Sequence, residues 1–190
     1  MRKFVYYIGA TLDGYIAGPG GEIDFFPLSD EMAAWIAGSF PETIPTQARD
    51  HFGLADAENR VFDTVVMGRG TYQPALALGV TSPYAHLRQY VVSTTLTVDD
   101  PRVTVVATDP VGLVRTLKAQ DTGQDVWLCG GGILAGALVD EIDEIVVKTY
   151  PVVAGDGIPM LAGAFGPGRF TPTRHETFTD GAQVTWLKRP

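Results

Sequence analysis

Short apolar runs, separated by turns that contain glycine or proline, set the pattern of the chain. The runs fall at residues 4–10, 62–67, 90–95, 103–107, 126–129 and 144–150 and are rich in valine, isoleucine and aromatic residues. Short segments that are apolar on both faces are typical of strands buried in a parallel sheet. The pattern therefore predicts a strand at each of these runs.

Helices are predicted between the strands. Ser29 or Asp30 is suited to begin a helix over 29–36, and the pair Asp109-Pro110 is suited to begin one that runs to about Gln120. An apolar segment over 134–139 follows a glycine run and predicts a further helix. Strands that alternate with helices form right-handed βαβ units with helices on both sheet faces. We therefore expect an α/β fold, a three-layer α/β/α arrangement around a mainly parallel mixed sheet.

Two segments depart from this alternation. Residues 174–188 alternate between apolar and polar positions on either side of Asp180-Gly181, which predicts a C-terminal antiparallel hairpin. Residues 38–59 have weak periodicity and contain prolines at 41 and 45. We expect this stretch to be an insertion beside a site, with a short helix over 46–54.

Composition narrows the possible functions. The 190 residues are 45% hydrophobic and 19% charged, as expected for one globular domain over 1–190. The net charge of −8 argues against a nucleic-acid partner, which requires a basic face. No apolar run approaches the roughly 20 residues that span a bilayer, and the N-terminus lacks the apolar region of a signal peptide. Together with the single cysteine, Cys129, these features predict a cytoplasmic protein without a membrane partner.

Glycine and hydroxyl residues cluster where three predicted strands end, at 68–71, 93–95 and 130–132. The carboxyl ends of parallel strands share one edge of a sheet, and ligands bind there. Glycines before a helix allow a phosphate to approach the free N–H groups of its first turn. We therefore favour a nucleotide-like ligand over plain structural turns. Gly130, Gly132 and Ala135 also match a dinucleotide-binding spacing, but they come late in the chain and no acidic residue ends the next strand.

Five segments in order resemble one known family. They are TLDGYIA at 11–17, VMGRGTY at 66–72, VVSTTL at 91–96, LCGGGIL at 128–134 and PVVAGDGIP at 151–159. Together they resemble the dihydrofolate-reductase-like superfamily, in the branch similar to the C-terminal reductase domain of bacterial riboflavin biosynthesis proteins. The resemblance extends over nearly the whole chain except residues 38–59.

The resemblance implies an NADPH-dependent reductase that transfers a hydride to a small heterocyclic or carbonyl substrate. By analogy, two groups of residues would hold the phosphates, and others would contact the pyrophosphate and the nicotinamide. The resemblance assigns Gly68, Arg69 and Thr71 to the phosphates, with Arg69, Ser93 and Thr94 at the 2′-phosphate; Gly130, Gly131, Gly132, Ile133 and Leu134 to the pyrophosphate and nicotinamide side; and Ile16 and Ala17 to closure over the nicotinamide. It also implies a homodimer, which the apolar patch at 158–161 would suit.

The proton donor is left open by the sequence. Folate reductases carry a carboxylate on the first helix, but that position falls on or near Met32 here, so water, Asp24 and Glu31 remain the candidates. The chain also lacks the zinc deaminase signature found beside such reductase domains. Its histidines have no metal-ligand spacing, so we expect no metal. A non-catalytic nucleotide- or flavin-binding module of the same fold is therefore the alternative function.

The glycine run gives one further expectation. Because the run lies in a turn at the edge of the sheet, we expect Gly131 and Gly132 to tolerate alanine without unfolding while ligand binding is lost. Cys129, at the start of the run, is expected to be a small buried residue rather than a reactive thiolate.

Overall fold

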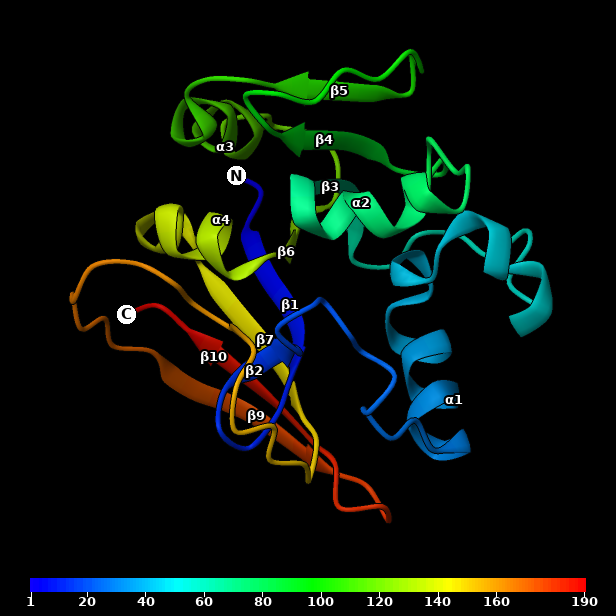
Figure 1. Ribbon diagram of the computed structural model, residues 1–190, viewed down its shortest axis with the longest axis vertical. Helices are drawn as coiled ribbons and strands as arrows, with labels where there is room; N and C mark the ends of the chain where they lie inside the picture. Colours follow the sequence, from blue (N-terminus) through cyan, green and yellow to red (C-terminus); the bar gives the residue numbers. More distant parts are fainter.

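A central eight-stranded sheet organises the computed structural model, which describes residues 1–190 (Figure 1). The strands lie in the order β5-β4-β3-β6-β1-β7-β10-β9. All are parallel from β5 to β7, and β10 and β9 add an antiparallel edge. The bounds are β1 Phe4–Ala10, β3 Phe62–Gly68, β4 Arg88–Val92, β5 Val103–Val106, β6 Asp125–Gly130, β7 Glu144–Thr149, β9 Thr171–Thr177 and β10 Gln183–Lys188. The predicted mainly parallel mixed sheet with a C-terminal hairpin is confirmed.

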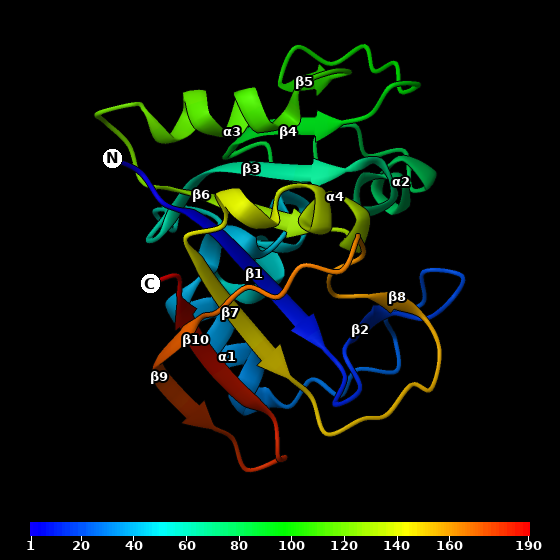
Figure 2. The same ribbon diagram turned by 90° about the vertical axis from the view of Figure 1, so that its left-hand side faces the viewer.

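Helices cover both faces of the sheet, as expected for a three-layer α/β/α fold (Figure 2). The helices are α1 Asp30–Ser39, α2 Arg69–Ala77, α3 Pro110–Lys118 and α4 Gly132–Ala137. One core contains side chains of α1 and α2, and the other contains side chains of α3 and α4. Strand β1 serves both cores, because Val5 and Tyr7 face the first while Phe4 and Tyr6 face the second. None of the helices is long and apolar enough to cross a membrane.

The two predicted helix starts are confirmed by their caps. The Ser29 hydroxyl accepts a hydrogen bond from the Met32 N–H at 3.2 Å at the start of α1. The Asp109 carboxylate accepts from the Gly112 N–H at 2.8 Å at the start of α3. Each bond satisfies a backbone donor that would otherwise lack a partner in the first helical turn.

The helix predicted over 46–54 is wrong. Residues 41–52 form three single turns of 3-10 helix instead: η1 Pro41–Thr43, η2 Thr46–Ala48 and η3 Asp50–Phe52. Side chains hold this segment in place. The buried Glu42 carboxylate accepts from the N–H groups of Val61 and Phe62, each at 2.8 Å. The buried Arg49 guanidinium donates to the Pro41 carbonyl at 2.9 Å. The Glu42 bonds join the segment to the start of β3, and the Arg49 bond closes the segment on itself.

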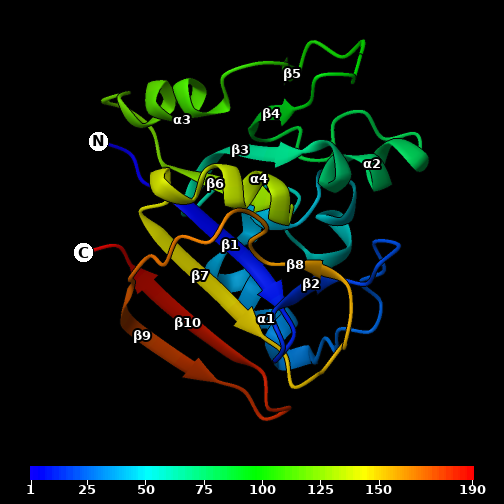
Figure 3. The ribbon, with the colours of Figure 1, turned by 60° about the vertical axis from the view of Figure 1, so that its left-hand side comes forward.

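Strand β4 and the stretch at 158–161 also differ from the expectation. Strand β4 ends at Val92 rather than at residue 95, because the Ser93 hydroxyl accepts from the N–H groups of Thr95 and Leu96 and closes a turn. The stretch at 158–161 contains β8, Ile158–Pro159, which pairs with β2, Tyr15–Ala17. This small ribbon lies at the carboxyl end of β1 (Figure 3).

Candidate functional site

The glycines that end β3 and β6 meet at the carboxyl edge of the sheet. A Cβ atom added at Gly68 would lie 3.5 Å from the Gly131 nitrogen and 3.6 Å from the Gly130 carbonyl oxygen. The starts of α2 and α4 are therefore side by side. Gly130 has a φ of +124°, which L side chains rarely adopt, so this position requires glycine. We call Gly68, Gly130 and Gly131 the glycine cradle.

Two side chains predicted for the cofactor face this cradle. A Cβ atom added at either Gly130 or Gly131 would lie 3.6 Å from Thr71 Oγ1. One at Gly131 would also lie 4.0 Å from Ile16 Cδ1. Neither α2 nor α4 has a side-chain cap at its N-terminus. The geometry therefore offers backbone donors, a hydroxyl and an apolar side chain around one point, as a phosphate followed by a ring would need.

Arg69 lies at the rim of the same edge. Its Nη1 donates to Thr95 Oγ1 at 2.7 Å, and both side chains are exposed. Arg69 is thus brought to the loop that contains the predicted Ser93 and Thr94. Ser93 is buried and its oxygen accepts the two backbone bonds that close the turn, whereas Thr94 is exposed. Thr95 was not among the predicted residues, although it belongs to the hydroxyl run at 93–95.

The remaining predicted cofactor residues differ in what they present to solvent. Ile133 is 81% exposed, whereas Leu134 is 7% exposed and packs in the core between the sheet and α4. Only the backbone of Leu134 can therefore face a ligand. Ile16 is half-buried, and Ala17 is buried in the β2–β8 ribbon.

The expectation that Gly132 tolerates alanine is wrong. A Cβ atom there would lie 2.0 Å from the Pro159 carbonyl oxygen, far inside the contact distance of real atoms. Gly132 is buried, and its own carbonyl accepts from the Ala162 N–H at 3.0 Å. The glycine allows β8 to pack against the start of α4. No such contact exists at Gly131, whose nearest neighbours beyond the adjacent residues are Thr71 and Ile16.

Asp13, in the TLDG segment at 11–14, holds the loop that follows β7. Its carboxylate accepts from the N–H groups of Ala154 at 3.1 Å and Gly155 at 2.7 Å, and from the Thr11 hydroxyl at 2.6 Å. The Thr11 hydroxyl and the two backbone donors lower the pKa of Asp13 to about 2. The carboxylate is therefore an anchor for the loop after β7 rather than a proton donor.

The two carboxylates proposed as proton donors do not approach the glycine cradle through any hydrogen bond. Asp24 is exposed in a turn. Glu31 accepts from Thr179 through its hydroxyl at 2.6 Å and its N–H at 3.0 Å, and these bonds lower the pKa of Glu31. Glu31 thus joins α1 to the β9–β10 hairpin and stays ionised. The catalytic role of either residue remains a prediction, and the geometry of Glu31 favours a structural role.

Lys148 is a residue that the sequence reasoning missed. It lies on β7, partly exposed, and its Nζ is 3.6 Å from the centroid of the Tyr7 ring. Burial lowers the pKa of Lys148 to about 7 and raises that of the neighbouring Cys129 to about 12. The expectation that Cys129 is not a thiolate agrees with this. The available signal was a lysine inside an otherwise apolar strand, where lysine is rare unless paired.

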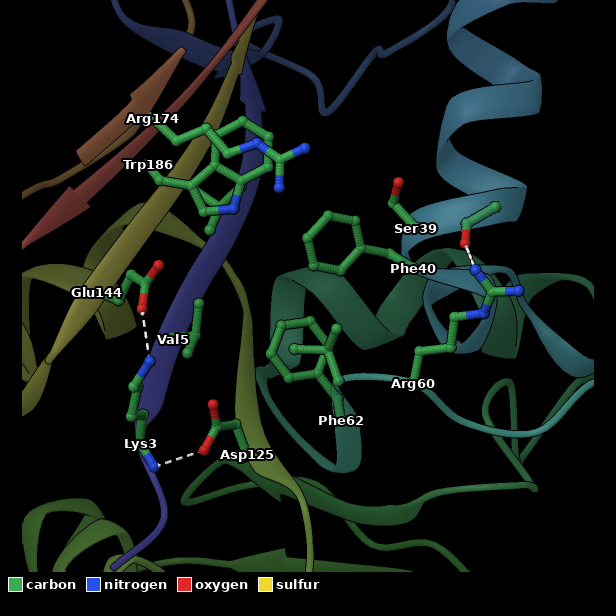
Figure 4. A pocket seen from close by; sticks show the side chains of 13 residues that line it. Lys3, Val5, Ser39, Phe40, Arg60, Phe62, Asp125, Glu144, Arg174 and Trp186 are labelled. Carbon is green, nitrogen blue, oxygen red and sulfur yellow. Dashed lines mark hydrogen bonds and ion pairs between the residues drawn. The ribbon is translucent and has the colours of Figure 1, made fainter. Parts of the chain in front are cut away.

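A separate cavity lies at the amino ends of the strands (Figure 4). Its volume is about 360 Å³, and Lys3, Val5, Phe40, Arg60 and Trp186 are among its lining residues. The Lys3 ammonium is paired with Glu144 at 3.1 Å, and the Arg174 guanidinium lies 4.5 Å from the Trp186 ring. None of the predicted site residues lines it. The structure also contains no group of three or more histidine, cysteine or acidic side chains able to hold a metal.

Solved structures with the same fold include two bacterial proteins. A candidate riboflavin biosynthesis protein from Shewanella sp. PV-4 is 25% identical, with a TM-score of 0.70 over 100% of this chain and 99% of that chain. A diaminohydroxyphosphoribosylaminopyrimidine deaminase/5-amino-6-(5-phosphoribosylamino)uracil reductase from Thermotoga maritima has a TM-score of 0.64 at 15% identity. This chain covers 57% of that protein. At that identity the second likeness shows the fold alone.

Two proteins of Bacillus subtilis strain 168, YwjB and YyaP, are similar in sequence, and both are uncharacterized. YwjB is 32% identical over 163 residues, 84% of this chain and 83% of YwjB. YyaP is 24% identical over 174 residues, 85% of this chain and 81% of YyaP. The model of the RibD C-terminal domain matches residues 2–184. This match spans nearly the whole chain, so the protein belongs to the RibD C-terminal domain family and has its dihydrofolate-reductase-like fold.

Proposed function

We propose that the protein is an NADPH-dependent reductase that transfers a hydride to a small heterocyclic substrate of the pterin or pyrimidinedione kind, or to a carbonyl compound. Membership of the RibD C-terminal domain family supports a reductase-type role. The observation that carries the proposal is the glycine cradle, where backbone, the Thr71 hydroxyl and Ile16 surround one point at the carboxyl edge of the sheet. NADPH would supply the hydride there.

The residues present fit such a cofactor. The uncapped starts of α2 and α4 offer N–H donors to the pyrophosphate, and the absence of side chains at the cradle gives the phosphates room. Arg69 lies beside the 93–95 loop, and its guanidinium is a fork of donors suited to a 2′-phosphate. Ile16 supplies an apolar contact for the nicotinamide. These assignments explain why all three clusters lie at one edge.

A non-catalytic nucleotide- or flavin-binding module is the second candidate. The engagement of Glu31 by Thr179 and the exposed position of Asp24 favour it, because neither carboxylate is placed as an acid at the cradle. Both functions require nucleotide binding. They differ in whether NADPH is consumed.

We also propose a cytoplasmic homodimer. The single Cys129 suits a reducing compartment. Large apolar side chains are exposed where β8 and residues 160–162 pack against α4: Ile133, Ile158 and Leu161. Exposed apolar side chains that lie close together suit an interface between subunits.

Fluorescence titration with NADPH and NADH, followed by NADPH oxidation against dihydropterins, pyrimidinediones and carbonyls, tests the proposal. We expect micromolar or tighter binding of NADPH, weaker binding of NADH, and oxidation with at least one substrate class. Tight binding without oxidation would favour the non-catalytic module. No binding of either nucleotide would refute the reductase, and absence of FMN binding in the same titration would refute the non-catalytic module as well.

A further inference from the structure

Lys148 occupies a position where the sheet is otherwise apolar. On β7 it pairs in register with Gly9 of β1 and Val184 of β10. Its neighbours two residues away, Val146 and Tyr150, both pack in the core beneath α1, so Lys148 faces the same side. Because Gly9 has no side chain, the lysine can lie across β1. A Cβ atom at Gly9 would be 3.7 Å from Lys148 Cε.

The Lys148 ammonium has no acidic partner. Other cations in or beside the sheet are paired: Arg2 with Asp63, Lys3 with Glu144, and Lys118 with Asp143. For Lys148, the close contact is instead the face of the Tyr7 ring at 3.6 Å. An aromatic face attracts a cation but accepts none of its N–H bonds in the way a carboxylate does. The ammonium therefore has donors available for a ligand.

The ionisable groups around Lys148 are almost all neutral at pH 7. Tyr7 on β1, Cys129 on β6, Tyr84 before β4 and Tyr150 after β7 all have pKa values raised by burial. Two carboxylates lie further out. Glu42 influences Tyr7, and Asp180 influences Tyr150.

Lys148 itself responds to burial in the opposite sense. Loss of hydration lowers its pKa to about 7, while Cys129 raises it to a smaller extent. It is thus the group in this cluster that exchanges a proton at neutral pH. A general acid is most effective when its pKa is close to the working pH.

The cluster adjoins the glycine cradle. Cys129 directly precedes Gly130, and it faces the same core as Tyr7 and Tyr150. Strands β6, β1 and β7 are consecutive in the sheet, so Cys129 and Lys148 flank β1 on one face near its carboxyl end. Lys148 is half-buried and has no acidic partner, and it lies across β1 from the residue that precedes the cradle, a position that suits a substrate with a polarised double bond.

We propose that Lys148 is the proton donor of this site, delivering a proton from Nζ to the heteroatom of a C=N or C=O bond in the substrate. The inference rests on the proposed reductase function. In the step, an N–H bond of the ammonium breaks and an N–H or O–H bond forms on the substrate. The adjoining carbon gains a hydride, with its two electrons, from the nicotinamide cofactor. Lys148 is left as a neutral amine and regains a proton from water.

Proton titration of the lysines by NMR tests this directly. The chain has four lysines, Lys3, Lys118, Lys148 and Lys188, so [13C]lysine labelling gives few signals. Lys148→Arg assigns the Lys148 signal, and Lys188→Arg is the matched control on the neighbouring β10. We expect Lys148 to titrate near pH 7, well below the ordinary value for a lysine. Titration of Lys148 at or above that ordinary value would overturn the proposal.

Nucleotides provide the second readout. NADP+ and NADPH carry the same phosphates but differ by one positive charge on the nicotinamide ring. If Lys148 faces that ring, its pKa is lower with NADP+ than with NADPH by about one pH unit, while Lys188 is unchanged. Normal nucleotide binding with an unresponsive Lys148 would overturn the inference and leave the proposed function standing. Failure of the parent protein to bind either nucleotide would refute the proposed function and the inference with it.

Turnover supplies the third readout. Lys148→Met keeps a similar side-chain volume and removes the ammonium. With a substrate that the parent reduces, we expect kcat to fall by about a hundredfold or more, with NADPH affinity and KM within a few fold. We also expect loss of the pH dependence near pH 7. A Lys148→Met protein with parental kcat and pH profile would show that Lys148 is not the donor.

Discussion

Alanine substitutions at adjacent glycines, Gly131 and Gly132, separate a ligand-facing position from a packing position. A methyl group at Gly132 would be forced to 2.0 Å from the Pro159 carbonyl oxygen, and the site is buried. Backbone on both sides of the contact must move. Overpacking of this kind costs about 1–3 kcal/mol of unfolding free energy. For a chain of this size the loss corresponds to a decrease in Tm of about 2–12 °C.

Gly131→Ala has a different expected result. Its φ of −91° is accessible to any residue, and the new methyl would be 3.6 Å from Thr71 Oγ1 and 4.0 Å from Ile16 Cδ1. These are ordinary contacts. The remaining cost is that alanine is a poorer helix N-cap than glycine, which is worth about 0.5–1 kcal/mol. We therefore expect a decrease in Tm of no more than about 4 °C.

For ligand binding, we expect Gly131→Ala to have the larger effect, although Gly132→Ala has the larger effect on stability. The Gly131 methyl would occupy the space between Thr71 and Ile16 that we assign to NADPH. Losing one bond to a phosphate costs about 1.5–3 kcal/mol, roughly a ten- to hundredfold loss of affinity. Thermal melting with and without saturating NADPH measures both effects in one assay. The reasoning would be refuted by a Gly131→Ala protein that keeps the full NADPH-induced shift, or by a Gly132→Ala protein that melts like the parent.

Three further predictions concern the rim of the site, the hairpin and the assembly. Arg69→Met should weaken NADPH by roughly ten- to hundredfold and leave NADH unchanged within about threefold, because only NADPH has the 2′-phosphate; isothermal titration checks this. Glu31→Ala should lower the urea midpoint at pH 7, and this effect should shrink as the pH falls below 4.5. The pKa of Glu31 is lowered by Thr179 in the folded state, so its contribution is present above the unfolded pKa near 4.5 and is lost as pH falls through the folded value. Sedimentation equilibrium should give about twice the chain mass of 20.4 kDa, and Leu161→Asp should shift the protein toward monomer; a parent species at the chain mass would contradict the homodimer.

The regular part of the fold was predictable because each strand has its own local pattern. Strand β1 has the predicted bounds, 4–10, since its residues are apolar on both faces and polar Thr11 and Asp13 follow at once. The segment over 46–54 was not predictable in the same way. Its conformation depends on two buried side chains that bind backbone groups elsewhere in the sequence. Glu42 accepts from the N–H groups of Val61 and Phe62, and Arg49 donates to the Pro41 carbonyl. Local propensity does not contain that information.

The candidate site was predictable only where backbone chemistry decides the residue type. The glycine cradle follows from glycines placed at strand ends, and this signal is visible in the sequence. The different roles of Gly131 and Gly132 depend on where residue 159 passes, which is a long-range feature. The environments of Lys148 and Glu31 also depend on long-range contacts that the local sequence does not show. Lys148 contacts Tyr7, 141 positions away, and Glu31 accepts from Thr179, 148 positions away.

Hydrogen-bond donors that lack an acceptor within the protein lie at the carboxyl edge of the sheet rather than at the cavity at the amino ends. At the cavity, the Lys3 ammonium is paired with Glu144, and the backbone N–H of Lys3 donates to the Asp125 carboxylate at 2.8 Å. Arg60 donates to the Gly38 carbonyl. At the carboxyl edge, two helices begin without side-chain caps and Lys148 has no acid beside it. Helices α2 and α4 each follow a parallel strand, so the connectivity turns the positive ends of both helix dipoles toward this edge. A ligand there would supply the acceptors that the protein lacks, and an anionic nucleotide beside a neutral, reducible ring meets both needs.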